Sequence, residues 1–356
     1  MKDITVLLTA CNISIAFGRI DCFRGISERN VRVIGVDSSE FGAGSKMVDK
    51  FYKVPQADSS DYLLKMFEIC KNERVDVIVP ATDEEVMILS KEKEKFGEIN
   101  TKIIASKPDT VEKSGDKGLF LKSLVEMGIP SAKFRVPKSI EELDRMCKEL
   151  GYPEKPVVFK PRKGRGNRGF RLIKSDIDKK DILLNQKPGV PHTTLEDLKG
   201  SLSGKPGEEF PKAVLMEYLT GKEYSVDVLA KDGEVLAVVP KIRVLPAPGL
   251  SLIAEVEMND EVIDKVKEIC KAFGFDYNIN IQLKYSEDGK LYPYEINPRV
   301  AATTALCKKA GANVVYYGVK MALGEEIPKA EVKDGMRMVR YYMEQYEDAQ
   351  DKGSNF

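Results

Sequence analysis

The chain contains no tryptophan and only one histidine, His192, among its 356 residues. A single histidine cannot complete a cluster of histidine and cysteine metal ligands. It also gives little support to a Ser–His or Cys–His catalytic pair, because His192 falls in a polar insertion. These absences point away from zinc chemistry and nucleophilic catalysis, and toward sites built from lysine, arginine, glycine and carboxylate side chains.

The six cysteines are scattered at positions 11, 22, 70, 147, 270 and 307, and no two of them form a Cys-x-x-Cys pair. This pattern is typical of reduced thiols and predicts a cytoplasmic protein. No apolar run approaches the roughly 20 residues of a membrane-spanning helix. The apolar residues 6–10 are followed by Asn12, Ser14 and Arg19, which favours a buried strand over a signal sequence.

Charge of neither sign predominates, since the chain has 56 basic and 56 acidic residues and a net charge of zero. That balance gives no indication of a nucleic-acid partner or of an anionic membrane surface. A hydrophobic content of 42% is enough for a large core. The length of 356 residues predicts two or three domains.

Residues 1–108 alternate between strand and helix patterns. This alternation is typical of a doubly wound parallel sheet, which belongs to the α/β class. The first turn, at residues 10–14, lacks the Gly-x-Gly-x-x-Gly pattern, so we expect no dinucleotide site there. The predicted strands are 4–9, 31–36, 75–80 and 102–105, and the predicted helices are 16–28, 62–72 and 83–96.

The predicted secondary structure changes twice over the rest of the chain. Residues 109–150 are predicted to be helical, with Asp116 opening one helix and Gly128 ending it. Short strands follow around a polar segment, 176–212, which we interpret as a surface insertion or lid. Strands return over 222–346, with a helix at 262–273 and another after Arg299, before a charged tail at 347–356 that we expect to be frayed.

A glycine-rich loop occupies residues 160–169, with Gly164, Gly166 and Gly169 in the Gly-x-Gly-x-x-Gly spacing. Strand patterns flank it on both sides, whereas a dinucleotide-binding turn leads into a helix. No Gly-Lys-Ser/Thr closes it, so it is not a Walker loop. A strand–loop–strand flap lets bare backbone N–H groups cover phosphates. Positive charge would come from Lys160, Arg162, Lys163, Arg165 and Arg168; the alternative is a basic surface turn.

A hairpin is predicted over residues 280–299, because Asp288-Gly289 separates two apolar-alternating runs. A two-residue turn there would pair Glu287 with Lys290. Counting outward from this turn, Gln282 would face Glu295 and Asn280 would face Asn297.

Three oxygen-bearing side chains would then share one face of the hairpin, namely Gln282, Glu295 and Asn297. Such oxygens suit a hard cation such as Mg²⁺. Arg299 follows the fixed turn at Pro298 and adds a cation that suits a phosphate. The alternative is the solvent-facing polar side of an ordinary hairpin.

An apolar strand at 214–217 ends at Glu217 and is followed by a glycine-containing turn that leads to Glu223. Its edge could pair with an adenine through backbone groups, and Glu223 could accept hydrogen bonds from ribose hydroxyls. The spacing alone does not separate this from a plain strand–turn–strand.

Together these segments resemble the ATP-grasp superfamily, and most closely the single-copy proteins that look like one half of the carbamoyl-phosphate synthase large chain. The matching motifs are residues 77–85, Asp116-Lys117 with 128–130, the loop 160–169, and Gln282 with 295–299. The resemblance implies an ATP-grasp fold of mixed α/β (α+β) class. It implies a pre-ATP-grasp domain at 1–108, an N-terminal grasp subdomain at 109–219 and a C-terminal grasp subdomain with a metal site at 220–346.

The same resemblance implies residue roles. Lys117, Lys160 and the glycines 164, 166 and 169 would contact ATP phosphates. Glu217 and Leu219 would lie at the adenine and Glu223 at the ribose. Gln282, Glu295 and Asn297 would hold one or two Mg²⁺ or Mn²⁺ ions, bridged by Glu295. Arg299 would hold an acyl phosphate, with Arg243 near the transferred phosphate.

The sequence departs from this family after Asn-Pro-Arg, where relatives usually have Ser or Gly and this chain has Val300-Ala301-Ala302 before Thr303. That position lines the acceptor side, so the second substrate is open. A carbamoyl-phosphate synthase needs two grasp modules and this chain has one, so that activity is not assigned.

The function that the resemblance implies is an ATP- and Mg²⁺-dependent ligase. It would activate a carboxylate as an acyl phosphate and couple it to an amine, the substrate being an amino acid or small acid. The alternatives are a phosphotransferase that releases an acyl or carbamoyl phosphate, and a protein that binds ATP without chemistry. Related proteins are often dimers, so a homodimer is among the expected states.

Overall fold

The computed structural model describes residues 1–164, 166–186, 189, 191–204, 209–247, 249–344 and 346. The predicted tail at 347–356 and Arg165 of the glycine loop lie outside the described residues. The chain separates into two compact units. Unit 1 comprises Met1–Glu112, Tyr224–Ile281 and Asn297–Phe356, and unit 2 comprises Lys113–Glu223 and Gln282–Ile296.

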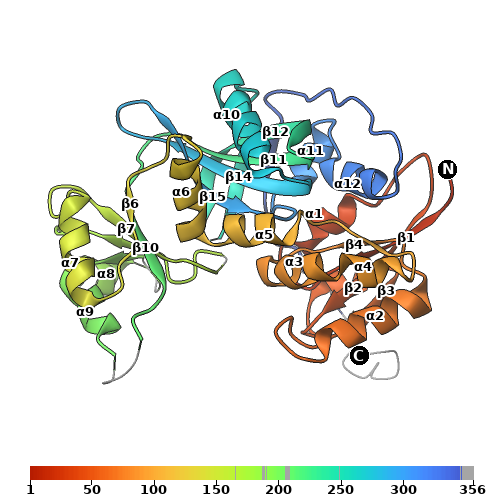
Figure 1. Ribbon diagram of the computed structural model, residues 1–356, viewed down its shortest axis with the longest axis horizontal. Helices are drawn as coiled ribbons and strands as arrows, with labels where there is room; N and C mark the ends of the chain where they lie inside the picture. The colour runs from red at the N-terminus through yellow and green to blue at the C-terminus, as the bar shows by residue number, and fades with distance from the viewer. Residues whose placement is uncertain are drawn as a thin grey trace. The chain divides into compact units, whose positions relative to one another are not determined.

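The N-terminal part of unit 1 is a parallel sheet with the strand order β3-β2-β1-β4-β5 (Figure 1). The order reverses between β1 and β4, so the predicted doubly wound sheet is confirmed. Its strands are β1 (Ile4–Leu8), β2 (Val31–Asp37), β3 (Lys50–Lys53), β4 (Val77–Val79) and β5 (Lys102–Ile103). Its helices are α1 (Ala16–Asp21), η1 (Ala43–Lys46), α2 (Tyr62–Glu73), α3 (Asp83–Leu89), η2 (Ser90–Glu92) and α4 (Lys93–Gly97).

The unbroken apolar runs of these strands follow from burial on both faces of the sheet. Successive strand residues point to opposite faces. Val6 and Leu8 join one core cluster with residues of α1, and Leu7 joins another with Tyr62 and Met66 of α2. Both faces are therefore covered, as a doubly wound sheet requires.

Three local predictions differ from the structure. The predicted helix at 16–28 ends at Asp21, and Gly25, with a φ of 65°, could not have continued it. The predicted helix at 83–96 is divided into α3, η2 and α4. Strand β3 was not predicted, because its four residues begin and end with lysine and show no apolar run.

A six-stranded sheet in the C-terminal part of the chain has the order β15-β14-β11-β12-β13-β16. Its strands are β11 (Glu223–Lys231), β12 (Glu234–Ala247), β13 (Leu250–Val256), β14 (Tyr277–Tyr285), β15 (Leu291–Asn297) and β16 (Arg337–Val339). Strands β11, β14 and β15 of this sheet cross the unit boundary, as does α5 (Pro108–Gly115). Unit 1 also holds α10 (Asp260–Phe273), α11 (Thr304–Lys309) and α12 (Val314–Ala322). Residues of β12, β13, α11 and α12 share a core with one face of the N-terminal sheet.

Unit 2 is built on a sheet with the order β6-β10-β7-β8-β9. Antiparallel strands β7 and β8 flank the glycine loop, which confirms the predicted strand–loop–strand. The predicted insertion at 176–212 contains α8, β9 and α9. The elements of this unit are α6 (Lys117–Glu126), β6 (Phe134–Arg135), α7 (Ile140–Glu149), β7 (Val157–Pro161), β8 (Arg171–Ile173), α8 (Lys179–Asn185), β9 (His192–Thr193), α9 (Leu195–Leu202) and β10 (Ala213–Glu217).

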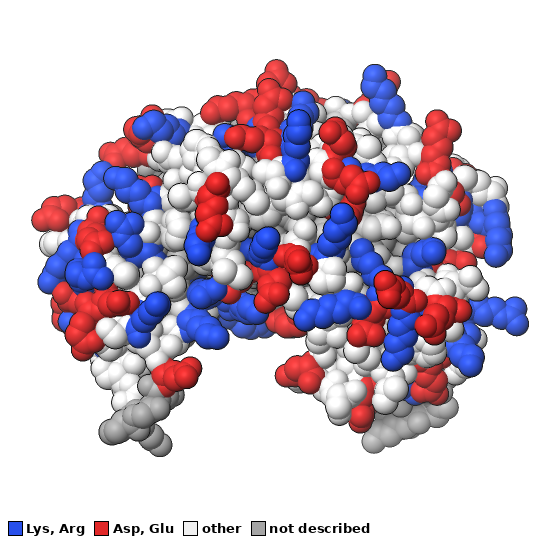
Figure 2. All heavy atoms as spheres, in the orientation of Figure 1, with Lys and Arg blue, Asp and Glu red and all other residues white. Residues whose placement is uncertain are grey.

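Charged side chains of both signs are interspersed on the face shown in Figure 2, as expected from the 56 basic and 56 acidic residues. Among the described residues, no helix combines the length and the apolar character needed to cross a membrane.

A substitution of Gly221 is expected to destabilise unit 2. The Gly221 N–H donates to Tyr285 O at 2.9 Å, and a Cβ at Gly221 would lie 2.6 Å from Tyr285 Cβ and 2.8 Å from Tyr285 O. Gly221→Ala should therefore lower the free energy of unfolding by about 1–3 kcal/mol in urea denaturation. Gly200→Ala, in a helix and with no atom within 4 Å of its added Cβ, is the control. Equal midpoints for the two variants would contradict the expectation.

Candidate functional site

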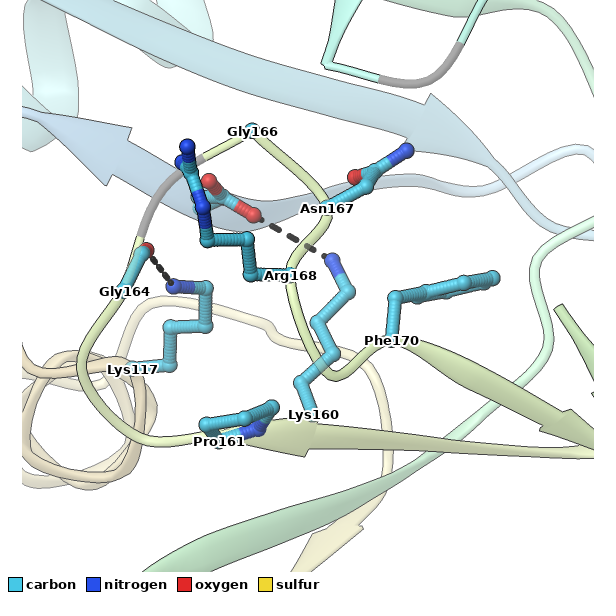
Figure 3. A pocket seen from close by; sticks show the side chains of 9 residues that line it. Lys117, Lys160, Pro161, Gly164, Gly166, Asn167, Arg168 and Phe170 are labelled. Carbon is cyan, nitrogen blue, oxygen red and sulfur yellow. Dashed lines mark hydrogen bonds and ion pairs between the residues drawn. The ribbon is translucent and has the colours of Figure 1, made fainter. Parts of the chain in front are cut away.

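A pocket in unit 2 lies between the glycine loop, the start of α6 and strand β15 (Figure 3). Three basic side chains and one carboxylate meet there, so the pocket carries an excess of positive charge. Its lining residues are Lys117, Lys160, Pro161, Gly164, Gly166, Asn167, Arg168, Phe170 and Glu295.

The glycine loop adopts a backbone that only glycine tolerates easily. Gly164, Gly166 and Gly169 have φ values of 131°, 64° and 71°. A Cβ at Gly169 would also lie 2.5 Å from Pro161 Cγ. The three glycines that the sequence singled out are therefore needed for the shape of the loop, which presents bare backbone to the pocket.

Lys117 is held over this loop by the start of α6. The N-cap residue Asp116 accepts, through Oδ1, hydrogen bonds from the N–H groups of Gly118 and Leu119 at 2.9 and 3.1 Å. The same oxygen pairs with Arg162 Nε at 2.8 Å. Lys117 Nζ then donates to Gly164 O at 3.1 Å (Figure 3). The predicted helix start at Asp116 is confirmed, and it fixes the direction of the Lys117 side chain.

Lys160 and Glu295 form an ion pair inside the pocket, with Nζ 3.2 Å from Oε2. Their side chains are only 11% and 18% exposed. Lys160 Nζ also lies 4.7 Å from the centroid of the Tyr294 ring. The structure thus places the cation predicted for phosphate directly against the carboxylate predicted for metal.

A second polar group in unit 2 surrounds Tyr294, which the sequence reasoning missed. The Tyr294 hydroxyl lies 2.7 Å from Glu223 Oε1 and 2.8 Å from Gln282 Oε1. Lys284 Nζ lies 3.9 Å from Glu223 Oε2. The sequence feature that could have indicated Tyr294 is its position directly before Glu295, on a predicted strand of alternating apolar and polar residues.

Glu217 and Leu219 lie at the end of β10. Glu217 Oε1 accepts from Lys133 N–H at 2.7 Å, and the Glu217 N–H donates to Lys133 O at 3.0 Å. Leu219 is buried. The carboxylate of Glu217 is therefore engaged with the chain segment before β6.

Asn297 of the predicted metal motif and the neighbouring Arg299 lie in unit 1. Asn297 Oδ1 accepts from Arg299 Nη2 at 2.9 Å, and Asn297 Nδ2 donates to Asn280 Oδ1 at 3.4 Å. The two asparagine side chains are in contact. Arg299 Nε lies 3.1 Å from Asp83 Oδ1, at the start of α3.

A buried polar network that the sequence reasoning also missed supports this end of β15. Asn280 Nδ2 donates to Asp227 Oδ1 at 2.8 Å, and Asp227 Oδ2 pairs with Lys241 Nζ at 2.7 Å. The Lys241 and Asp227 side chains are 1% and 4% exposed. Burial acts to lower the pKa of Lys241, but the charge of Asp227 outweighs it, so that pKa is raised. The network therefore holds a protonated lysine behind Asn280.

The turn after Arg299, where the sequence departs from its relatives, is held by arginines. Arg19 is buried and donates to Val300 O at 3.1 Å and Ala301 O at 3.2 Å. Arg340 Nη2 donates to Ala302 O at 3.0 Å. Burial, followed by the charge of Arg299, lowers the pKa of Arg19 to about 9. The backbone carbonyl groups of Val300, Ala301 and Ala302 therefore all accept hydrogen bonds from arginine side chains.

Arg243 lies on β12 and bonds across to β13. Its Nη2 donates to Leu250 O at 2.9 Å and its Nε donates to Ser251 Oγ at 3.1 Å.

The predicted two-residue turn at Asp288-Gly289 is wrong. The Ser286 N–H donates to Lys290 O at 2.9 Å and the Gly289 N–H donates to Ser286 O at 3.1 Å, so Ser286 rather than Glu287 closes the hairpin opposite Lys290. Gly289, with a φ of 76°, is the left-handed residue that ends a three-residue loop. An Asp-Gly pair fits both loop lengths, so the sequence could not separate them.

Among the described residues, no group of three or more His, Cys, Asp or Glu side chains is placed to hold a metal ion. The predicted metal motif is of another kind, since it combines the carboxylate of Glu295 with the amides of Gln282 and Asn297. Its oxygens suit Mg²⁺ better than a metal that prefers nitrogen or sulfur.

Two family models match the chain. Residues 209–344 match the model described as ATP-grasp in the biosynthetic pathway with Ter operon, and residues 13–104 match the PylC-like N-terminal domain. The match to an ATP-grasp model therefore covers the C-terminal part of the chain. The predicted resemblance and the predicted ATP-grasp fold are therefore confirmed.

Solved structures agree on the fold. The biotin carboxylase domain dimer of Hydrogenobacter thermophilus 2-oxoglutarate carboxylase, complexed with MgADP, is 16% identical with a TM-score of 0.68, covering 94% of this chain and 73% of that one. The L-amino acid ligase from Bacillus licheniformis is 15% identical with a TM-score of 0.62, covering 91% of this chain and 75% of that one.

Among curated proteins, the carbamoyl phosphate synthase large chain of Bifidobacterium adolescentis is 25% identical over 321 residues, or 85% of this chain and 26% of that protein. The C-terminal section of the Aquifex aeolicus large chain is 22% identical over 237 residues, or 64% of this chain and 40% of that protein. The chain thus spans less than half the length of these two relatives.

Breaking the buried ion pair is expected to destabilise unit 1. Lys241→Met leaves the Asp227 carboxylate buried without its partner, which costs about 3–5 kcal/mol in the free energy of unfolding. Urea denaturation measures the loss. Adding Asp227→Asn removes the unpaired charge and keeps an oxygen for Asn280, so the double variant should recover part of the stability. Lys309→Met, at an exposed lysine, is the control and should change stability by less than about 0.5 kcal/mol. A Lys241→Met variant as stable as this control would refute the expectation.

Proposed function

We propose that this protein, which has the ATP-grasp fold, is an ATP- and Mg²⁺-dependent ligase that joins a carboxylate to an amine. The observation that supports this proposal most strongly is the pocket of unit 2, where Lys117, Lys160, the glycine loop and Glu295 meet. We infer that the carboxylate substrate is an amino acid or a small acid, by analogy with the ligase structures that share the fold. A cytoplasmic location and a homodimeric state are part of the proposal.

The residues that line the pocket suit phosphate oxygens. The glycine loop offers backbone N–H groups without side chains in the way, and Lys117 and Lys160 offer charge-assisted hydrogen bonds. Phosphoryl transfer depends mainly on such positioning and charge neutralisation. The loop would therefore act as a phosphate flap, with Gly164, Gly166 and Gly169 setting its shape.

The nucleoside would lie beside the end of β10 and the start of β11. In the proposal, Glu217 and Leu219 contact the adenine and Glu223 accepts from the ribose. The burial of Leu219 supports an apolar wall. The placement of Glu223 against Tyr294 supports a carboxylate of fixed orientation.

Gln282, Glu295 and Asn297 would hold one or two Mg²⁺ ions, and Mn²⁺ could replace them. When bound, the metal would neutralise phosphate charge during transfer. The ion pair of Lys160 with Glu295 supports a coupled exchange. Lys160 would turn to a phosphate oxygen as Glu295 turns to the cation, so neither charge is left alone.

The proposed reaction has two steps. A carboxylate oxygen attacks the γ-phosphorus and the bond to ADP breaks, which gives an acyl phosphate and ADP. The amine nitrogen then attacks the acyl carbon, inorganic phosphate leaves and the nitrogen loses a proton. Arg299 would hold the acyl phosphate and Arg243 would lie near the transferred phosphate.

In domain terms, we propose that residues 1–108 form the pre-ATP-grasp domain. Residues 109–219 would form the grasp subdomain that carries the flap, and residues 220–346 the subdomain that carries the metal motif. The family-model matches at 13–104 and 209–344 support this division.

The direct test measures ADP release with ATP, Mg²⁺ and pools of amino acids and small acids, followed by mass spectrometry of the product. Amine-dependent amide formation is the expected result. A hydroxamate trapped by hydroxylamine, with no amine-dependent product, would instead indicate release of an acyl phosphate. ATP binding without substrate-dependent ADP release would indicate a non-catalytic protein.

Removing the Glu295 carboxylate is expected to abolish turnover. Glu295→Ala would lose the only carboxylate of the proposed metal motif, and losing a preorganised charge-stabilising group costs about 10²-fold or more in rate. Steady-state ADP release measures the effect. Glu287→Ala is the control, because Glu287 lies in the turn of the same hairpin with a side chain 83% exposed. Near-normal activity of Glu295→Ala would refute the assignment.

Removing Lys160 is expected to change the affinities for nucleotide and for metal in opposite directions. Lys160→Ala loses a charged phosphate contact, so the dissociation constant for ATP should rise roughly 10- to 100-fold. Glu295 would lose its counter-charge, so Mg²⁺ should bind more tightly when no nucleotide is present. Calorimetric titrations measure both constants. Lys163→Ala, at an exposed lysine of the same loop, is the control; identical ATP constants for the two variants would count against Lys160.

A further inference from the structure

Tyr294 lies among three residues that have separate proposed roles. Its hydroxyl lies 2.7 Å from Glu223 Oε1, at the proposed ribose contact, and 2.8 Å from Gln282 Oε1, at the proposed metal motif. Its ring centroid lies 4.7 Å from Nζ of Lys160, at the proposed phosphate contact. The side chain belongs to a residue only 9% exposed, so these contacts are shielded from water.

The hydroxyl has one proton, and it cannot donate that proton to two acceptor oxygens at once. The Glu223 carboxylate is the stronger acceptor of the two, so it receives the O–H. The phenol oxygen then remains as an acceptor toward Gln282. The Gln282 amide satisfies it when rotated by 180°, which brings Nε2 to the phenol and turns Oε1 to the other side.

We propose that Tyr294 is a positioning residue that links the nucleoside end of the site to its metal end. By accepting from the amide of Gln282, it leaves the amide oxygen to face the cation. By donating to Glu223, it holds that carboxylate in one orientation for the ribose hydroxyls. The inference rests on the proposed function, because both ends need their ligands to be nucleotide and metal.

If Tyr294 had a purely structural role, different effects of its substitution would be expected. A buried tyrosine that only fills space would affect stability, and its loss would act equally on all nucleotides and metals. A positioning role concerns one hydroxyl group. It therefore requires that Tyr294→Phe, which removes only that group, weakens metal binding and ribose discrimination together.

The test compares wild type, Tyr294→Phe and Tyr292→Phe, the last changing a tyrosine of the same strand. Mn²⁺ binding is followed by electron paramagnetic resonance with a non-hydrolysable ATP analogue, and binding of ATP and 2′-deoxy-ATP by calorimetry. Loss of an outer partner of a metal ligand typically costs about 10–100-fold in affinity, so Tyr294→Phe should weaken Mn²⁺ binding by that factor. Its preference for ATP over 2′-deoxy-ATP should also fall, while Tyr292→Phe should match wild type.

A double-mutant cycle adds a measurement that is independent of stability. In the wild-type background, the effects of Glu223→Gln and Gln282→Ala on nucleotide binding should be non-additive, because both residues share the Tyr294 hydroxyl. In the Tyr294→Phe background the same two effects should add.

The outcomes separate the two proposals. Wild-type protein without metal-dependent affinity for the ATP analogue overturns the proposed function and, with it, the role of Tyr294. Wild-type binding that Tyr294→Phe leaves unchanged overturns the role of Tyr294 alone, as does a cycle that is additive in both backgrounds. Weaker Mn²⁺ binding together with lost ribose discrimination supports the inference.

Discussion

The ion pair between Lys160 and Glu295 is the constraint on which the candidate site depends. Its members are 135 residues apart in sequence and lie 3.2 Å apart in unit 2. Either charge alone in so sheltered a place would be costly, since a buried charge needs a partner. The pair is also suited to exchange, because a triphosphate and a cation can replace one partner each. The pairing thus keeps both charges in place without leaving either one unpaired.

Two supports keep the flanking segments in position. In unit 2, the Asp116 cap fixes the start of α6 and so directs Lys117 to the glycine loop. In unit 1, the contacts run from Lys241 through Asp227 to Asn280, and Asn280 meets Asn297. Neither support would contact a nucleotide in the proposal. Both act by restricting where the residues of the site can lie, which is the main requirement for phosphoryl transfer.

Much of this arrangement could be predicted from local patterns. The doubly wound sheet followed from its apolar strands, the helix start from Asp116, and the flap from three glycines between two strands. The hairpin turn could not be predicted, because Asp-Gly fits loops of two or three residues and only the hydrogen bond from Ser286 to Lys290 separates them. The short strand β3 carried too few apolar residues to show a period.

The sequence by itself determined the fold class of the N-terminal sheet, the start of α6 and the glycine positions of the loop, because strand alternation, capping and glycine backbone freedom act within a few positions of the chain. Only the tertiary structure decided which side chains meet. Tyr294 is hydrogen-bonded to Glu223, 71 residues away in the sequence, and Arg19 is hydrogen-bonded to Val300, 281 residues away. Such partners depend on how distant segments pack together, and no local pattern carries that information.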